Sequence, residues 1–148
     1  MRMLKWIALL TLAGCGGDNG TAATSSVPPA PSPTSIAVAV GPNGSFGFSP
    51  QVVNIQPGDT VQWVWVSGSV AHTVTSGAPG AVDGKCCSVP AGTPVNRTTC
   101  NSTSYAQPQP FTYSQTFLTA GTFPYFCEVH GAMMTGTVVA GNGRGGGP

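Results

Sequence analysis

The segment Cys127–Met134, with the sequence Cys-Glu-Val-His-Gly-Ala-Met-Met, constrains this chain more than any other part of it. It places a thiol, an imidazole and two thioethers within eight residues. A thiolate and a thioether are soft donors and an imidazole is borderline, so copper is the metal that suits all three together. The rest of the chain must then supply a second imidazole and a rigid scaffold that brings it to this segment.

The chain contains two histidines, His72 and His130. A single histidine on a strand is more often a surface or core residue than a ligand, but His130 follows Cys127 by three residues and His72 lies in an extended segment upstream. Two histidines and a cysteine with a weak axial methionine are typical of blue-copper electron-transfer sites. Zinc would not explain a methionine, because zinc prefers Cys, His and carboxylate donors. A binuclear copper centre would need a second cysteine inside the ligand segment, and none is there.

Composition favours strands and turns over helices. Only 6% of the 148 residues are charged, while 21 are Gly and 14 are Pro. No cluster of Lys and Arg could meet a phosphate backbone, which argues against nucleic-acid binding. Short extended patterns predict an all-β, antiparallel Greek-key β-sandwich of about seven to eight strands. These patterns lie at 36–40, 51–55, 61–66, 70–75, 111–117, 122–127 and 136–140. Within them, Pro124 indicates local edge character.

The N-terminus has the features of an export signal. Two basic residues precede a short apolar run, and Leu12-Ala13-Gly14-Cys15 resembles the lipobox of bacterial lipoproteins. The run is too short for a permanent membrane span. We therefore expect residues 1–14 to be a lipoprotein signal peptide and Cys15 to carry lipid. An ordinary signal peptide with a chance cysteine is the alternative.

The predicted domain organisation follows from this signal. Residues 15–34 are the lipidated cysteine and a flexible Pro/Ser/Thr-rich tether. Residues 35–140 form the copper-binding domain, and residues 141–148 are a Gly-rich tail expected to be disordered. The mature protein is expected in the bacterial cell envelope, anchored to the membrane and facing the periplasm or the exterior. After cleavage its formal charge is 3 − 4 = −1, which argues against strong electrostatic steering of a partner.

The segment 76–110 contains three cysteines, repeated Gly and Pro, and no periodicity, so a cross-linked loop without regular structure is expected. Exported cysteines that can reach one another normally pair. A Cys87–Cys100 disulfide is favoured, with Cys86 as the alternative to Cys87. Such a bridge contributes about 3 kcal/mol in the chain-entropy model. A disulfide of Cys127 with the remaining cysteine is the alternative to metal ligation. We expect the 76–110 segment to flank the site and shape partner docking.

Three segments, 56–63, 71–74 and 121–130, resemble the cupredoxins of the plastocyanin, amicyanin and pseudoazurin type. The resemblance covers roughly residues 35 to 140, and the Cys-x-x-His loop followed by methionine is its most specific part. It implies that His72 and His130 are the imidazole ligands of one copper ion, Cys127 the thiolate and a methionine the axial ligand. It also implies that His130 lies near the surface among apolar residues and is the electron exit.

The axial ligand could be either of two neighbouring methionines. The spacing Cys-x-x-His-x-x-Met, as in amicyanin, selects Met133. Counting back from the final strand, Met134-Thr135-Gly136-Thr137-Val138 matches the family pattern Met-x-Gly-x-Val and selects Met134. We favour Met134, because strand register determines position more firmly than loop length does.

The expected function is electron transfer by a monomeric, lipid-anchored, mononuclear blue-copper protein that cycles between Cu(I) and Cu(II). Redox partner proteins would dock near His130 through mainly apolar contacts of mild salt sensitivity. No small-molecule substrate is expected. The sequence shows no catalytic carboxylate pair that would indicate an enzyme. Copper capture or delivery in the envelope would use the same ligands but need exchangeable metal. A metal-free adhesion module is a third candidate, for which the matching ligand types would be coincidence.

Overall fold

The computed structural model describes residues 32–66, 70–96, 100 and 106–141. The expected signal peptide, Cys15, most of the tether and nearly all of the Gly-rich tail lie outside the described residues. Within the part that is described, no helix is long and apolar enough to cross a membrane.

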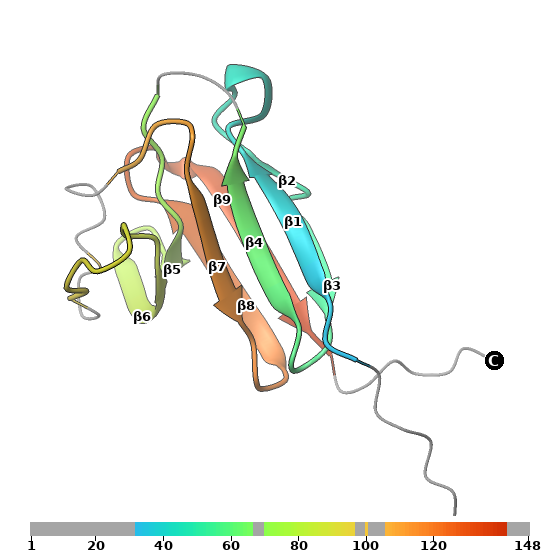
Figure 1. Ribbon diagram of the computed structural model, residues 1–148. Helices are drawn as coiled ribbons and strands as arrows, with labels where there is room; N and C mark the ends of the chain where they lie inside the picture. Colours follow the sequence, from blue (N-terminus) through green and yellow to red (C-terminus); the bar gives the residue numbers. More distant parts are fainter. Residues whose placement is uncertain (1–31, 67–69, 97–99, 101–105, 142–148) are drawn as a thin grey trace, which may run out of the picture. The chain divides into compact units, whose positions relative to one another are not determined.

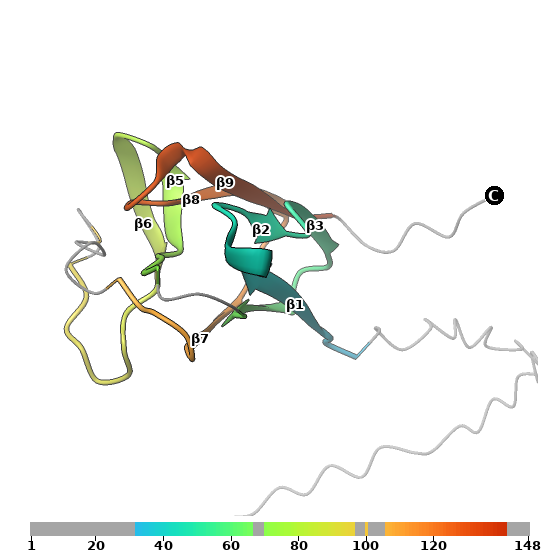
Figure 2. The same ribbon diagram turned by 90° about the horizontal axis from the view of Figure 1, so that it is seen from above.

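The described residues form a β-sandwich of two sheets, which Figure 2 shows as separate layers. The first sheet has the order β2-β1-β4-β7 and the second the order β3-β9-β8-β5-β6 (Figure 1). The nine strands are β1 (Ser35–Val40), β2 (Phe48–Ser49), β3 (Val52–Ile55), β4 (Thr60–Trp65), β5 (Thr75–Ala78), β6 (Ala81–Cys87), β7 (Thr112–Thr116), β8 (Gly121–Cys127) and β9 (Gly131–Ala140). A short 3₁₀ helix, η1 (Pro42–Gly44), follows β1. The predicted all-β class is confirmed.

Both sheets are mixed, whereas the sequence patterns suggested antiparallel pairing throughout. β1 pairs with β4 in parallel, with Ser35 opposite Thr60, and β3 pairs with β9 in parallel. The remaining strand pairs are antiparallel. The alternation of side chains is the same for both directions of pairing, so the pattern of a short strand does not determine its direction.

The core lies between the sheets and is built by alternation along the strands. In β4, Val61, Trp63 and Trp65 are buried while the residues between them are partly exposed. The Trp63 ring meets that of Tyr125 on β8 edge to face, with 5.2 Å between centroids. Tyr125 in turn covers Gly136, where an added Cβ would lie 2.4 Å from the tyrosine ring. The aromatic side chains therefore join the two sheets beneath the ligand-bearing end of β8.

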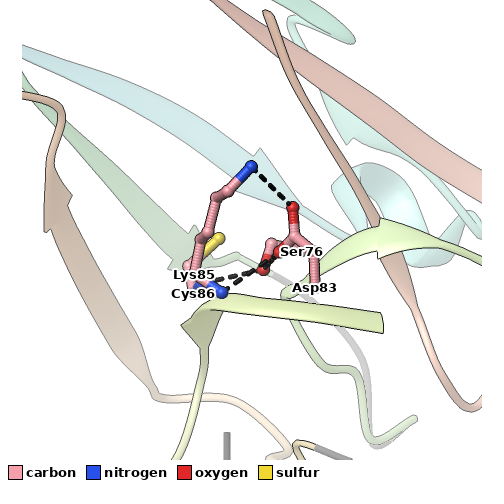
Figure 3. Close-up of polar contacts among 4 residues, drawn as sticks. All are labelled: Ser76, Asp83, Lys85 and Cys86. Atoms are coloured by element: carbon pink, nitrogen blue, oxygen red, sulfur yellow. Dashed lines mark hydrogen bonds and ion pairs between the residues drawn. The ribbon is translucent and has the colours of Figure 1, made fainter. Parts of the chain in front are cut away.

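The expectation of an unstructured 76–110 segment is wrong for its first part. β5 and β6 form an antiparallel hairpin there, whose polar side chains supply contacts that hydrophobic periodicity does not reveal. Figure 3 shows Ser76 donating a hydrogen bond to Asp83 and accepting one from the Cys86 N–H, at 2.8 Å. Lys85 closes the group with an ion pair to Asp83 at 3.2 Å.

The strand predicted at 70–75 is also largely wrong, because β5 begins only at Thr75. His72 instead forms an isolated bridge with Gln107. The local edge character expected of Pro124 is confirmed. β8 pairs with β9 along its length, but its pairing with β5 is limited to Tyr125 and Phe126, so Pro124 lies beyond it.

Candidate metal centre

His72, Cys127 and His130 come together at one end of the sandwich. One nitrogen from each histidine and the cysteine Sγ all lie within 4.8 Å of one another. The Cys127 Sγ is 3.3 Å from His130 Nδ1 and 4.0 Å from His72 Nδ1. A sulfur and two imidazole nitrogens that converge in this way fit copper, because a soft thiolate and borderline imidazoles are donors that copper takes together.

Cys127 and His130 are positioned by a tight turn between β8 and β9. The His130 N–H donates to the Cys127 carbonyl at 3.2 Å, and the Met133 N–H donates to the His130 carbonyl at 3.3 Å. Gly131 has φ +56°, a conformation that favours glycine. Cys127 lies opposite Gly131, after an irregularity in the ladder. The turn therefore brings thiol and imidazole together with little help from the rest of the chain.

The two methionines at the start of β9 face opposite sides. Met134 is fully buried in the same core cluster as Cys127, whereas Met133 is 71% exposed. Successive side chains of a strand point to opposite faces, so only one of the two neighbours can face the core. Met134 therefore lies on the core face, in the cluster that contains Cys127, and Met133 lies at the surface.

His72 reaches the site from the connection between β4 and β5. Its Nδ1 faces the Cys127 sulfur, while its Nε2 lies against Gly41 at the end of β1. A Cβ on Gly41 would lie 2.7 Å from that Nε2, and Gly41 has φ +66°. Glycine at this position therefore makes room for the buried imidazole.

Burial and the nearby His130 lower the pKa of His72, and burial lowers the pKa of His130. Both shifts favour the neutral imidazoles that a metal requires.

Thr73 connects the two ligand-bearing segments. Its backbone N–H donates to the Cys127 Sγ at 3.3 Å. Its hydroxyl accepts a hydrogen bond from the Glu128 N–H at 2.8 Å. Sequence reasoning missed this residue, and its place directly after His72 was the only available signal. Glu128 contributes its backbone here and is not part of the donor group.

Phe46 is a second residue that sequence reasoning missed. Its ring stacks on His130, with 4.1 Å between centroids and 19° between planes, and it is 48% exposed. Phe46 belongs to the turn between β1 and β2, which a hydrogen bond from the Gly41 N–H to the Gly47 carbonyl closes. This turn therefore contacts both imidazoles, through Gly41 and through Phe46. An aromatic residue in a Gly-rich turn was its only sequence signal.

The structure pairs Cys87 with Cys100, with 5.5 Å between Cα atoms. Cys86, the alternative partner, is buried and does not take part in this bridge, and Cys127 is not disulfide-bonded. The sulfur of Cys127 is thus available to a metal. Because Cys86 and Cys87 are neighbours on β6, their side chains leave the strand on opposite sides.

Comparison with known proteins agrees with this geometry. Residues 35–141 match the family described as copper binding proteins, plastocyanin/azurin family. Plastocyanin of Scenedesmus fuscus is 35% identical over 97 residues, which cover 65% of this chain and 88% of that protein. Chloroplastic plastocyanin of Tetradesmus obliquus is 35% identical over 98 residues, covering 66% of this chain and 60% of that protein.

A solved structure supports the fold alone. The purple cupredoxin of Nitrosopumilus maritimus is 21% identical and has a TM-score of 0.50, with coverage of 71% of this chain and 98% of that one. The family match extends from β1 to the residue after β9 and includes every donor described above. The chain belongs to the plastocyanin/azurin family of copper-binding proteins.

Proposed function

We propose that this protein is a mononuclear blue-copper electron-transfer protein with His72, Cys127, His130 and Met134 as ligands. The observation that carries the proposal is the convergence of one thiol sulfur and two imidazole nitrogens within 4.8 Å. Met134, buried in the core cluster that contains Cys127, supports its assignment as the axial ligand over the exposed Met133. Copper, when bound, supplies the Cu(I)/Cu(II) couple.

The protein's own contribution is to hold the donors still. Cys127 and His72 are buried, and the Thr73 N–H donates to the sulfur. Gly41 and Phe46 contact the two imidazoles from the β1–β2 turn. Donors fixed by packing and by hydrogen bonds move little when the charge at the site changes. Small movement means a small reorganisation cost for each electron transferred.

His130 is the donor nearest the surface, and it supports docking of redox partners at this end of the sandwich. Exposed apolar side chains accompany it: Phe46 stacks on its ring, Val129 precedes it and is 45% exposed, and Met133 follows shortly after. With few charges in the chain, association with a partner is expected to be mainly apolar and mildly salt-sensitive. We place the electron exit at His130.

Membrane attachment through lipid on Cys15 is part of the proposal. It is supported by the lipobox-like Leu12-Ala13-Gly14-Cys15 and the Pro-rich stretch that follows. The domain would then work on a bacterial envelope membrane, facing the periplasm or the exterior, as a tethered carrier between redox partners. Expression of the full chain in a bacterium tests this. Mass spectrometry should find diacylglycerol on Cys15 in the membrane fraction, and Cys15→Ala should release the protein from it.

Copper delivery, the competing function, needs metal that exchanges readily. Three of the four proposed donors are buried, which favours a tightly held ion. The relatives reported above are plastocyanins, which favours a redox carrier over an enzyme. We therefore propose the carrier alone.

Addition of Cu(II) to the domain tests the proposal directly. The parent should develop an intense visible thiolate-to-copper absorption, and Cys127→Ser should lose it while keeping the β-sandwich signature in circular dichroism. Absence of the band in a folded parent would overturn the copper assignment. Rapid loss of copper to a mild chelator would overturn the carrier role in favour of delivery.

A further inference from the structure

The backbone around His72 lies outside the regular ladders of the sheets. β5 begins only at Thr75, so His72, Thr73 and Val74 need hydrogen-bond partners of another kind. Buried backbone N–H and C=O groups are almost always paired, because leaving them unpaired is costly. Thr73 and Val74 are fully buried and His72 nearly so. The residues that pair with this segment therefore determine where the first ligand lies.

The 76–110 segment supplies those partners at both ends. The His72 N–H donates to the Gln107 carbonyl at 2.9 Å, and the Gln107 N–H donates back to the His72 carbonyl at 3.0 Å. The Ser88 N–H donates to the Val74 carbonyl at 2.9 Å, and the Val74 N–H donates to the Ser88 Oγ at 2.7 Å. Four hydrogen bonds thus hold the residues on either side of Thr73.

The direction of these bonds matters for the sulfur. In an extended chain, the backbone polar groups of successive residues point to opposite sides. His72 and Val74 are both bonded to the 76–110 segment, so the N–H of Thr73 between them points the other way. There it donates to the Cys127 Sγ at 3.3 Å. Holding His72 and Val74 therefore aims the Thr73 N–H at the thiol.

Ser88 is the specific element of this arrangement. It is fully buried and follows Cys87, which the disulfide joins to Cys100. Its hydroxyl accepts the Val74 N–H, the bond that a strand carbonyl accepts in an ordinary ladder pair. Alanine would keep the Ser88 N–H but remove this acceptor. The Val74 N–H thus has its acceptor on a serine side chain and not on a ladder carbonyl.

We propose that Ser88, held by the Cys87–Cys100 disulfide, is a positioning residue for the metal centre. With Gln107, it fixes the His72–Val74 backbone and so sets both the first imidazole and the hydrogen bond to the Cys127 sulfur. The 76–110 segment then tunes the site as well as flanking it. The expected effect on redox properties rests on the proposed copper function. The positioning of the His72–Val74 backbone does not, because it concerns the metal-free protein.

Amide hydrogen exchange of the metal-free domain, measured by NMR, tests whether Ser88 positions the His72–Val74 backbone. Ser88→Ala should speed exchange of the Val74 and Thr73 amides by about fivefold, as loss of one hydrogen bond predicts. Ser76→Ala is the matched control, because Ser76 is also buried and accepts a backbone N–H, that of Cys86, in the same hairpin (Figure 3). It should speed exchange at Cys86 and leave Thr73 unchanged.

A second variant keeps the test decisive if Ser88→Ala does not fold. Gln107→Pro removes the N–H donated to the His72 carbonyl and keeps the Gln107 carbonyl that accepts the His72 N–H, at a partly exposed position. It should speed exchange at His72 and Thr73 by about fivefold. Unchanged protection of Thr73 in whichever of these variants fold, or equal change in the Ser76→Ala control, would overturn the proposal.

The copper-loaded domain provides an independent readout. Ser88→Ala should shift both the reduction potential and the thiolate-to-copper band, because the hydrogen bond to the sulfur is perturbed, whereas Ser76→Ala should shift neither. A potential and band equal to those of the parent would overturn the tuning role. If the parent forms no such band, the proposed copper function fails, while the exchange experiment still decides whether Ser88 positions the His72 segment.

Discussion

The two segments that carry the proposed ligands are held in different ways. Cys127, His130 and Met134 belong to one β-hairpin, whose turn is closed by its own backbone hydrogen bonds. His72 lies between strands. Its backbone is hydrogen-bonded to Gln107, and that of the nearby Val74 to Ser88, while Gly41 leaves room for the imidazole. The difference shows that one half of the site is assembled locally, while the other half depends on several distant segments.

The comparison also indicates how a substitution in each segment should affect the site. A change in the hairpin acts directly on the core, because Cys127 and Met134 are part of the core cluster. A change in the segments that hold His72 acts on one imidazole and on the hydrogen bond to the sulfur. The four experiments below separate these two kinds of effect, in order of decreasing size.

Substitution of the two methionines should produce the largest contrast. Met134→Ala removes a fully buried side chain and should destabilise the domain by about 2–5 kcal/mol. Met133→Ala removes one that is 71% exposed and should change stability by less than about 0.5 kcal/mol. Urea unfolding of the metal-free domain measures both. Comparable losses for the two variants would contradict the assignment of Met134 to the core face.

Removal of the disulfide should loosen the His72 half of the site selectively. The double variant Cys87→Ser/Cys100→Ser opens a bridge with a sequence separation of 13 and should cost about 3 kcal/mol. At denaturant concentrations where the variant is still folded, amide exchange should rise at Thr73 and Val74 more than at His130 and Met133. Equal increases in both segments would mean that the two halves of the site are not held separately.

Two glycines of the β1–β2 turn allow a matched test of the space around His72. Gly41→Ala and Gly44→Ala both place a side chain at positive φ, at a cost of about 1 kcal/mol each. Only the Cβ at Gly41 would contact the His72 imidazole, since nothing lies within 4 Å of that at Gly44. Copper affinity should fall at least about tenfold in Gly41→Ala and stay near the parent value in Gly44→Ala. Competition with a chelator of known affinity measures both.

Acidification should have the smallest effect. Burial lowers the pKa of His72, as does the nearby His130, and burial lowers the pKa of His130. Below the unfolded pKa of about 6.5, the unfolded chain therefore binds more protons than the folded one, and stability is lost as the pH falls. The melting temperature of the metal-free domain should drop between about pH 7 and pH 5.

The copper-loaded domain is the control for this pH dependence. Bound metal holds the imidazoles deprotonated, so its melting temperature should fall less over the same range. The pKa of Asp83 is also lowered: burial raises it, but the hydrogen bond from Ser76 and the contacts with Lys85 outweigh burial. An unperturbed aspartate already titrates below the range from pH 5 to pH 7, so a lowered pKa keeps Asp83 ionised throughout and does not disturb the comparison. A metal-free domain that is more stable at pH 5 than at pH 7 would contradict the argument.

Much of the fold could be predicted from local patterns. Alternating apolar residues in β1 predicted a strand, an apolar run predicted β4, and Pro124 predicted a local edge. The β5–β6 hairpin was missed because the polar contacts of Ser76 and Asp83 hold it, and such contacts leave no hydrophobic period. The parallel pairing of β1 with β4 was missed because alternation is the same in both directions.

The sequence by itself determined the hairpin half of the site. The spacing of Cys127, His130 and Met134 follows from a turn and a strand period, and both are local properties of the chain. Only the tertiary structure decided which residues support the two imidazoles, the sulfur and the His72–Val74 backbone: Gly41, Phe46, Thr73, Ser88 and Gln107. The physical reason is that a backbone hydrogen bond can be made with any segment that folding brings near. Which segment arrives depends on the packing of the two sheets and on the Cys87–Cys100 bridge.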